Sequence, residues 1–327
     1  MNSPIEIRRL VPADAPDLTR CFERCYGATY ANDIFYATQR LAASIEAGHL
    51  RSVVAATEDA IVGHTGLSVR HDGARAIEAG NTVVDPDWRG QGLLGRLGAA
   101  LAELCRAEGF AAYVHYPTTA HEIMQKRSVL GRGTETGLML GYIPAETNYT
   151  GIDHARGRAA ATVVFQPFTT MPPRDVYLPE RHAQVLQTLF ENCNLKRTFT
   201  APALPVGAGS KPEFVMHERR SLLHAFVCRA AAGLPQQIEA ARRASAATVI
   251  QIDLCLDDPA VSAAVDALVA GGFYFSALLP EFAHTDVLRL QWLAEGSAAE
   301  FEPELANPAA QRLLRYITAD RHTAGSA

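Results

Sequence analysis

The order of apolar and polar positions over the first 145 residues predicts a mixed domain of helices and strands. Apolar runs at 52–56, 61–69 and 76–84 are separated by short polar turns, which is typical of an antiparallel meander. A helix follows, marked by leucines at helical spacing and a glycine that ends it: Leu94, Leu97, Leu101, Leu104 and Gly109. Further helices are expected at 13–26, 34–47 and 120–130, and further strands at 5–10, 111–116 and 136–143.

The second half shows a related but weaker pattern. Apolar and polar residues alternate from 250 to 256, which predicts a half-buried strand. Asp258 and Pro259 then predict the start of a helix, because they supply a capping side chain and a proline at the first helical position. That helix ends at Gly271, and a closing strand is expected at 288–292. This order repeats part of the first half, so we expect a diverged internal duplication.

Two stretches rich in turn-forming residues, 144–160 and 205–212, interrupt the pattern. At roughly 150 residues per domain, a chain of 327 residues suggests two domains, and the first stretch is the expected boundary. We therefore expect one domain over residues 1–147, a second over 161–316 and a flexible tail over 317–327.

Composition narrows the class of protein. The chain has 30 Lys and Arg against 35 Asp and Glu, and this mild acidic balance argues against non-specific nucleic-acid binding. Neither a signal peptide nor an apolar run of about 18 residues is present, so no membrane partner is expected. The cysteines are scattered without zinc-ligand spacing, which favours a reduced, cytoplasmic protein without a metal site. They are Cys21, Cys25, Cys105, Cys193, Cys228 and Cys255.

The segment from Asn81 to Gly95 carries the most informative pattern, a strand that runs through a glycine-rich turn into a helix. Glycines allow close backbone approach, and the first N–H groups of a helix lack partners and lie at the positive end of its dipole. Such a turn suits a phosphate-bearing ligand, with a purely structural turn as the alternative. No Gly-Lys-Ser/Thr follows, which excludes a Walker loop, and the dinucleotide fingerprint is absent.

The run Arg89-Gly90-Gln91-Gly92-Leu93-Leu94, preceded by Val84-x-Pro-x-Trp, resembles motif A of the GNAT acyltransferase superfamily. In that family, Arg/Gln-x-x-Gly-x-Gly/Ala cradles the pyrophosphate of acyl-coenzyme A. Leu94 replaces the last Gly or Ala of the pattern, and Gly95 follows it. The resemblance covers residues 5–145 in element order. It implies the GNAT fold, a central mixed and mostly antiparallel sheet flanked by helices.

For the second half, the resemblance implies a degenerate GNAT-like α/β domain that lacks a phosphate loop of its own. We expect this domain to pack on the first one and to shape the acceptor site.

The resemblance also implies acetyl-CoA or another short acyl-CoA as the co-substrate, and no metal. Pantetheine would pair with the strand before the turn, and the phosphates would lie on the amides of the turn. The implied coenzyme-binding residues are Thr82, Val83, Val84, Arg89, Gly90, Gln91, Gly92, Leu93, Leu94 and Gly95.

Glu78 is the candidate for the group that takes the proton of an attacking amine. It lies six residues before Val84, the register at which several GNAT enzymes place a basic carboxylate. Unbroken alternation places Glu78 on the same face as Gly80, whereas a bulge at Gly80 would turn it away. We expect apolar surroundings to raise the pKa of Glu78. An exposed glutamate at a strand edge is the alternative.

GNAT enzymes usually carry a tyrosine on the helix after the fifth strand, which protonates the leaving thiolate. The helix expected at 120–130 has no tyrosine. Tyr116 and His121 are the candidates for this general acid. The alternatives are that water protonates the thiolate or that the thiolate leaves without assistance.

Two further groups of residues have either a structural or a functional interpretation. The aromatic run between the first two helices belongs either to the core or to a wall of the acceptor site: Tyr26, Tyr30, Phe35 and Tyr36. Arg219 and Arg220 lie in a charged run, and they are either solvated or bind a substrate carboxylate.

These observations favour an enzyme, a GNAT-type N-acyltransferase that moves an acetyl or other short acyl group from coenzyme A to a primary amine of a small molecule by direct attack. A non-catalytic acyl-CoA-binding module is the alternative, as is a thioester decarboxylase that depends on His115. We expect a monomer or a homodimer.

Overall fold

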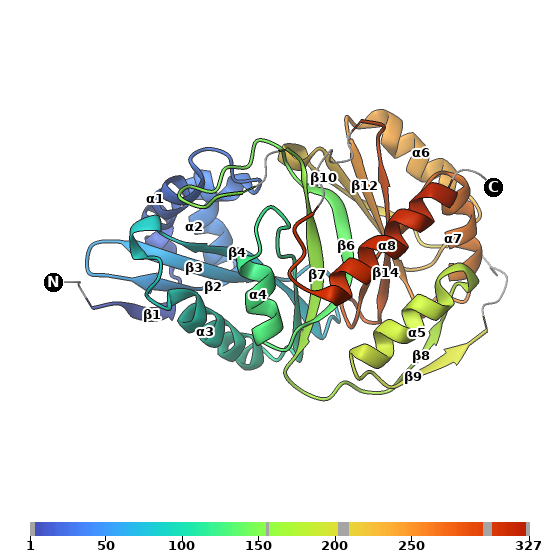
Figure 1. Cartoon of the computed structure of the whole chain (residues 1–327), viewed down its shortest axis with the longest axis horizontal. Coiled ribbons are helices and arrows are strands. Elements are labelled where there is room, and N and C mark those ends of the chain that lie inside the picture. The colour runs from blue at the N-terminus through green and yellow to red at the C-terminus, as the bar shows by residue number, and fades with distance from the viewer. Residues whose placement is uncertain (1–3, 155–156, 202–208, 297–302, 325–327) are drawn as a thin grey trace.

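The computed structural model describes residues 4–154, 157–201, 209–296 and 303–324. Within them, twelve strands form one continuous mixed sheet, and two further strands pair separately. Helices flank the sheet along its whole length (Figure 1). The expected fold class is confirmed as an α/β protein with a large mixed sheet flanked by helices.

The N-terminal half builds the sheet order β1-β2-β3-β4-β5-β7-β6, in which β4 and β5 run parallel and the other neighbours antiparallel. Its strands are β1 (Glu6–Arg9), β2 (Leu50–Ala56), β3 (Ile61–Ser68), β4 (Ala76–Val84), β5 (Ala112–His115), β6 (Thr134–Ile143) and β7 (Ala159–Pro167). Its helices are α1 (Ala15–Tyr26), α2 (Thr38–Glu46), α3 (Leu93–Ala107) and α4 (Ile123–Leu130), with short 3-10 turns η1 (Pro12–Asp14), η2 (Asp33–Tyr36) and η3 (Pro86–Trp88).

Strand β7 was missed by the sequence pattern, and it changes the domain division. It inserts between β5 and β6, so the sheet of the N-terminal half extends to Pro167 rather than stopping at residue 147. Residues 159–165 are buried on both faces of the sheet, and such a strand shows no polar alternation. The turn-rich stretch before β7 is therefore a loop within the first sheet.

The C-terminal half adds β10 (Glu213–His217), β11 (Leu222–Val227), β12 (Val249–Cys255), β13 (Tyr274–Leu279) and β14 (Val287–Leu293) to the large sheet. The separate pair is β8 (Arg174–Tyr177) and β9 (Arg197–Thr200). The helices are α5 (Ala183–Asn192), α6 (Leu234–Ala244), α7 (Val261–Ala270) and α8 (Pro308–Thr323), with the 3-10 turns η4 (Glu180–His182) and η5 (Glu218–Arg220).

The strand order of the first half recurs in the second. Order β10-β11-β12-β14-β13 has the same parallel and antiparallel steps as β3-β4-β5-β7-β6. Helix α6 connects β11 to β12 as α3 connects β4 to β5, and α7 takes the place of α4. The expected internal repeat thus has a counterpart in the topology.

The two halves meet edge to edge at β6 and β13, where Gly137 faces Ala277. A Cβ atom on Gly137 would lie 2.2 Å from the carbonyl oxygen of Ser276, so the close approach requires glycine. The Ser276 hydroxyl donates to the carbonyl of Leu138 at 2.9 Å. One apolar cluster continues across this junction, so the halves share both a sheet and a core.

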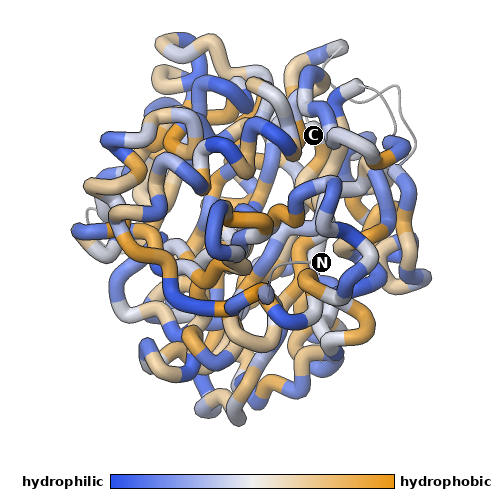
Figure 2. Tube along the Cα trace, turned by 90° about the vertical axis from the view of Figure 1, so that its left-hand side faces the viewer, coloured by the Kyte–Doolittle hydropathy of each residue, from blue (hydrophilic) through white to orange (hydrophobic). Residues whose placement is uncertain are grey.

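Alternate residues of the first sheet pack against different helices. Val53 and Ala55 pack with α3, whereas Val54 between them packs with α1. Figure 2, seen from the N-terminal half, shows hydrophobic and hydrophilic stretches alternating along the chain. Because successive side chains of a strand point to opposite faces, the sheet packs against helices on both of its faces.

The expected flexible tail is wrong over most of its length. Helix α8 continues to Thr323, and Ile317 on it is fully buried. The Asp320 carboxylate accepts from the N–H of Phe275 at 2.8 Å and pairs with Arg181 at 2.8 Å, which ties the last turns to the sheet. Residues 325–327 lie outside the described part. Among the described residues, no helix is both long and apolar enough to cross a bilayer.

Candidate active site

A cavity of about 680 Å³ opens where β4 and β5 diverge. The two strands pair only from Ala76 to Ala79, after which β4 continues alone to Val84. The cavity is lined by α1, β4, the turn before α3, α3 itself, the end of β5, α4, β6 and the loop at 147–152. One edge of residues 80–84 therefore faces the cavity without a strand partner in the described chain.

A bulge in β4 widens this opening. Opposite the single residue Thr65, β4 carries both Asn81 and Thr82. Asn81 has a left-handed φ of 54°, and its side-chain oxygen accepts from the Tyr30 hydroxyl at 2.9 Å. The hydroxyls of Thr65 and Thr82 lie 2.7 Å apart. The bulge lies beyond Gly80 in sequence, so Glu78 and Gly80 both remain on the cavity wall.

The glycine turn (residues 89–95) leads from β4 into α3. Gly90 and Gly92 have φ values of 77° and 74°, and Gly92 is the N-cap residue of α3. The N–H groups of residues 90–92 donate no hydrogen bond within the described chain. The tight part of the turn lies before Leu94, so a leucine is tolerated there in the first helical turn. The turn presents free donors at a helix N-terminus, which is an anion-binding arrangement.

Most of the expected coenzyme-binding residues line the cavity. These are Thr82, Val83, Val84, Arg89, Gly90, Gly92, Leu93 and Leu94, whereas Gln91 and Gly95 are not part of its wall. The Arg89 guanidinium donates to the carbonyls of Val84 at 3.1 Å and Thr150 at 2.5 Å. This side chain therefore braces the turn against the loop at residue 150.

Arg127 on α4 is a candidate that the sequence analysis did not single out. It lines the cavity, and its Nη2 atom would lie 3.5 Å from a Cβ atom placed on Gly95. Within the described chain, Arg127 makes no ion pair. A free guanidinium thus lies beside the first turn of α3, where only the three-dimensional arrangement of α3 and α4 brings it.

Glu78 lines the cavity with a side chain that is 15% exposed. Its two carboxylate oxygens accept from Nε and Nη2 of Arg70, each at 2.7 Å. Burial alone would raise the pKa of Glu78, but the charge and hydrogen bonds of Arg70 outweigh it and lower the pKa, helped by Arg289 and Arg220. The expected upward shift is therefore wrong, because a paired arginine replaces the apolar surroundings that we expected.

Several buried polar atoms on the cavity wall have no hydrogen-bond partner in the described chain. They are Tyr116 Oη, His115 Nε2, His121 Nδ1 and Thr147 Oγ1. Burial raises the pKa of Tyr116, so its phenol stays neutral and can donate. Burial lowers the pKa of both histidines to about 4, which keeps their rings neutral near pH 7. Buried polar atoms without a partner are rare, and these four belong to residues that line the same cavity.

The aromatic run divides between core and cavity. Tyr26 and Tyr30 line the cavity. Phe35 stacks on Phe22 with ring centres 4.0 Å apart and is fully buried in the core. The Tyr36 hydroxyl accepts from the N–H of Tyr30 at 3.0 Å and so positions the cavity wall from behind.

The corresponding turn of the second half, residues 228–233 between β11 and α6, differs in two ways. Strands β11 and β12 stay paired from Leu222 to Val227, so they do not diverge as β4 and β5 do. The N–H of Ala230 donates to the Asp258 carboxylate at 2.6 Å. The Asp258 carboxylate thus occupies an N–H group that would otherwise be free to bind a phosphate.

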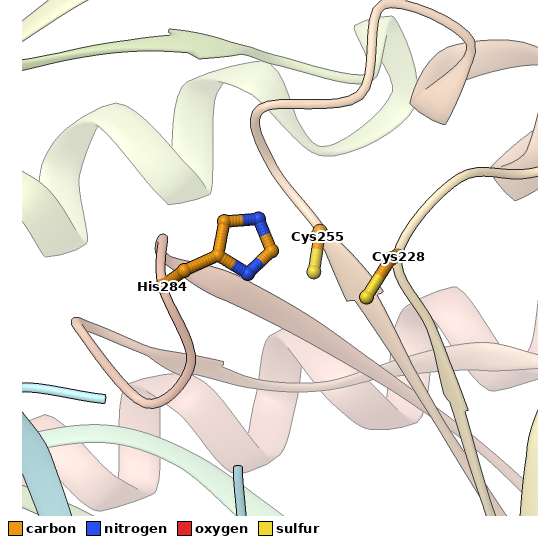
Figure 3. A group of neighbouring side chains, drawn as sticks. All are labelled: Cys228, Cys255 and His284. Atoms are coloured by element: carbon orange, nitrogen blue, oxygen red, sulfur yellow. The ribbon is translucent and has the colours of Figure 1, made fainter. Parts of the chain in front are cut away.

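One group of residues that could hold a metal ion is found among the described residues (Figure 3), and none of its members lines the cavity. Cys228 directly follows β11, Cys255 is the last residue of the neighbouring strand β12, and His284 lies in the loop after β13; their ligand atoms are within 4.8 Å of one another. Two sulfurs and an imidazole are ligand types that zinc accepts. Burial raises the pKa of both thiols, so without an ion they are neutral.

The model of the acetyltransferase (GNAT) family matches residues 15–125, from α1 into α4. No curated protein matches the chain.

Similar solved structures include an N-acetyltransferase from Staphylococcus aureus at 13% identity and TM-score 0.41, covering 51% of this chain and 100% of that one. A phosphinothricin acetyltransferase from Sinorhizobium meliloti, in complex with acetyl-CoA, is 23% identical with TM-score 0.40 and covers 50% and 88%. The ribosomal-protein-S18-alanine N-acetyltransferase from Escherichia coli is 17% identical with TM-score 0.41 and covers 52% and 97%.

The family match spans the glycine turn, Glu78 and Tyr116, the residues on which the resemblance and its implied chemistry depend. The predicted resemblance is confirmed: this chain carries a domain of the GNAT acetyltransferase family.

Proposed function

We propose that this protein transfers an acetyl or other short acyl group from coenzyme A to a primary amine of a small molecule by direct attack. The observation that carries this proposal is the opening between β4 and β5, which leads from the unpaired edge of residues 80–84 to the free amides of the glycine turn. The match of residues 15–125 to the acetyltransferase (GNAT) family model supports the proposal.

In this proposal the pantetheine arm hydrogen-bonds the free edge of β4, as a further strand would. The pyrophosphate lies on the amides of Gly90 and Gly92, where the dipole of α3 adds to the hydrogen bonds. Arg127 supplies a positive charge beside the same helix turn. The volume of about 680 Å³ falls in the range of pockets that hold small ligands.

Glu78 assists the loss of the amine proton, and Tyr116 protonates the leaving sulfur. The amine nitrogen attacks the thioester carbonyl carbon, and the carbon–sulfur bond then breaks. Because its pKa is lowered, Glu78 is ionised at neutral pH; it attracts the incoming ammonium, and the proton leaves through water held by the carboxylate. The neutral Tyr116 phenol donates its proton to the departing sulfur, and the resulting phenolate takes a proton back from water.

The second half acts as a tandem, degenerate GNAT-like unit in this proposal. Its strands β11 and β12 stay paired, and an N–H group of its turn already donates to Asp258, so the coenzyme binds in the first half. Its contribution is the closing of the acceptor end of the cavity through η5. The free cysteines favour a reducing compartment such as the cytoplasm.

The test is turnover by the full chain with acetyl-, propionyl- and malonyl-CoA over a panel of small primary amines, with the acylated product detected by mass spectrometry. We expect Tyr116→Phe to lower kcat by about 100-fold. The matched control is Tyr177→Phe on β8, outside the cavity, which should keep the wild-type rate.

The same experiment separates the alternatives. Acyl-CoA binding without product from any amine would contradict the proposal and favour a non-catalytic module. Release of carbon dioxide from malonyl-CoA without an amine, abolished in His115→Ala, would favour a decarboxylase instead.

A further inference from the structure

Arg220 is the contribution of the C-terminal half to the cavity wall. Every other described residue that lines the cavity comes from the N-terminal half, between Cys25 and Gln166. Arg220 belongs to η5, the short turn between β10 and β11. A side chain from the second half thus reaches the space in which the proposed acceptor must lie.

Contacts between the halves hold this side chain in place. The Arg220 guanidinium lies over the ring of Tyr142, 4.2 Å from its centre, and donates to the Tyr142 carbonyl at 3.1 Å. Arg158 donates to the carbonyl of Arg220 from the side of the first sheet. The neighbouring Arg219 donates to the carbonyl of Ala28 at 2.8 Å. Turn η5 is therefore docked, and its second arginine is preorganised rather than solvated.

Of the three arginines near this end of the cavity, two form ion pairs within the described chain and the third, Arg220, does not. Arg70 pairs with Glu78, and Arg289 pairs with Asp253 at 2.6 Å. Arg220 has no carboxylate within 4.0 Å among the described residues, although its charge is close enough to lower the pKa of Glu78. Beside the Glu78–Arg70 pair, the cavity wall thus offers a free guanidinium for an anion.

We propose that Arg220 binds a carboxylate of the acceptor, which makes the acceptor a small amino-carboxylate such as an amino acid. The guanidinium fork matches a carboxylate in two-point geometry, and stacking on Tyr142 leaves one edge of the fork for the ligand. This inference rests on the proposed function and adds the substrate class and the residue that selects it. Arg220 acts here in binding and selection and takes no part in the proton transfer.

The test compares matched pairs of acceptors that differ only in the carboxylate, such as phenylalanine with 2-phenylethylamine and lysine with cadaverine. The panel covers the twenty amino acids and short ω-amino acids, with acetyl-CoA as the donor. The wild type should prefer the acid of at least one pair by about 10- to 100-fold in kcat/KM, the range for a hydrogen bond to a charged group.

Substitution then assigns the preference to the residue. Arg220→Met should raise KM for the acid by the same factor, with kcat and the KM for the amine nearly unchanged, and Arg220→Lys should recover part of the loss. Arg243→Met on the exposed face of α6 is the matched control and should behave as wild type. The unfolding midpoint and acetyl-CoA affinity of each variant show whether the fold and the coenzyme site are intact.

The outcomes distinguish this inference from the proposed function. If acetyl-CoA binds and amines are acylated with no preference for any carboxylate, or with a preference for phosphorylated amines, the assignment of Arg220 is overturned while acyl transfer stands. Equal losses for acid and amine in Arg220→Met would also overturn it. If no acceptor turns over, the affinity of the same panel for the protein–coenzyme complex is measured instead. The inference is then contradicted if no acid binds more tightly than its matched amine in an Arg220-dependent way.

Discussion

Replacing Glu78 by Gln tests how the paired carboxylate works. Gln has the same shape and keeps one oxygen for Arg70, but it loses the charge and one of the two hydrogen bonds at 2.7 Å. Because Glu78 is 15% exposed and Arg70 is 43% exposed, solvent screens the pair, and we expect a loss of about 1 kcal/mol of stability at pH 7. The fold and the coenzyme site should survive.

The effect on the reaction should be much larger than the effect on stability. Loss of a group that holds both the amine and the water through which its proton leaves lowers kcat by about 100- to 1,000-fold. The affinity for acetyl-CoA should change little, because Glu78 lies on the acceptor side of the bulge in β4. Glu239→Gln is the matched control, since Glu239 also pairs with arginines but lies on the surface of α6.

The pH dependence follows from the direction of the pKa shift. The folded pKa of Glu78 lies below its usual value of 4.5, so the ion pair stabilises the fold above about pH 4.5 and is lost as the pH falls through the folded pKa. Glu78 is therefore ionised throughout pH 6–9, and the variant should lose the same factor in kcat at every pH in that range. Full activity of Glu78→Gln across this range would refute the reasoning, as would a loss confined to acetyl-CoA affinity.

Three further predictions concern the fold and the metal-ligating group. Gly137→Ala brings a Cβ atom to 2.2 Å from the Ser276 carbonyl, so urea unfolding should show a loss of about 1–3 kcal/mol, and an unchanged midpoint would contradict the close approach. Arg197→Met removes the guanidinium partner of the buried Asp286 carboxylate and leaves Glu281 to Arg174, and it should cost about 3–5 kcal/mol by the same assay; a loss below about 1 kcal/mol would show that the pairs do not stabilise the fold. Dialysis against a chelator should leave the acyl-transfer rate unchanged, because none of the three residues in Figure 3 lines the cavity; a rate restored only by zinc would contradict this.

Local patterns were sufficient for the elements that frame the coenzyme site. Strands β2, β3 and β4 alternate or are bounded by turns, and α3 has a leucine stripe with Gly92 before it and Gly109 after it. These signals arise within a few residues of sequence and do not depend on distant contacts. Hence the sequence predicted the strand, the glycine turn and the helix in the right order.

Features that depend on distant contacts were not predicted. The pKa of Glu78 is lowered by Arg70, which hydrogen-bonds it from just beyond the end of the neighbouring strand β3, and Arg220 reaches the cavity only because the second half docks edge to edge. Helix α8 was missed because its polar residues gave a weak stripe, although its buried face is tied to the sheet through Asp320. Sequence spacing gives no sign of such partners, so their effects on charge and position appear only in the structure.

The central claim is that acyl-CoA occupies the opening between β4 and β5, and calorimetric titration of acetyl-CoA tests it most directly. Gly80 lies on the cavity wall, and a Cβ atom there meets no other atom within 4 Å, so Gly80→Leu fills the opening without straining the fold. Gly233→Leu is the matched control, because Gly233 is exposed at the corresponding turn of the second half and has an ordinary φ of −83°.

The account predicts that the wild type and Gly233→Leu bind acetyl-CoA equally well and that Gly80→Leu binds at least about tenfold more weakly, a loss of about 1.4 kcal/mol. Equal affinity in all three proteins would place the coenzyme elsewhere, and no binding by the wild type would contradict the account as a whole.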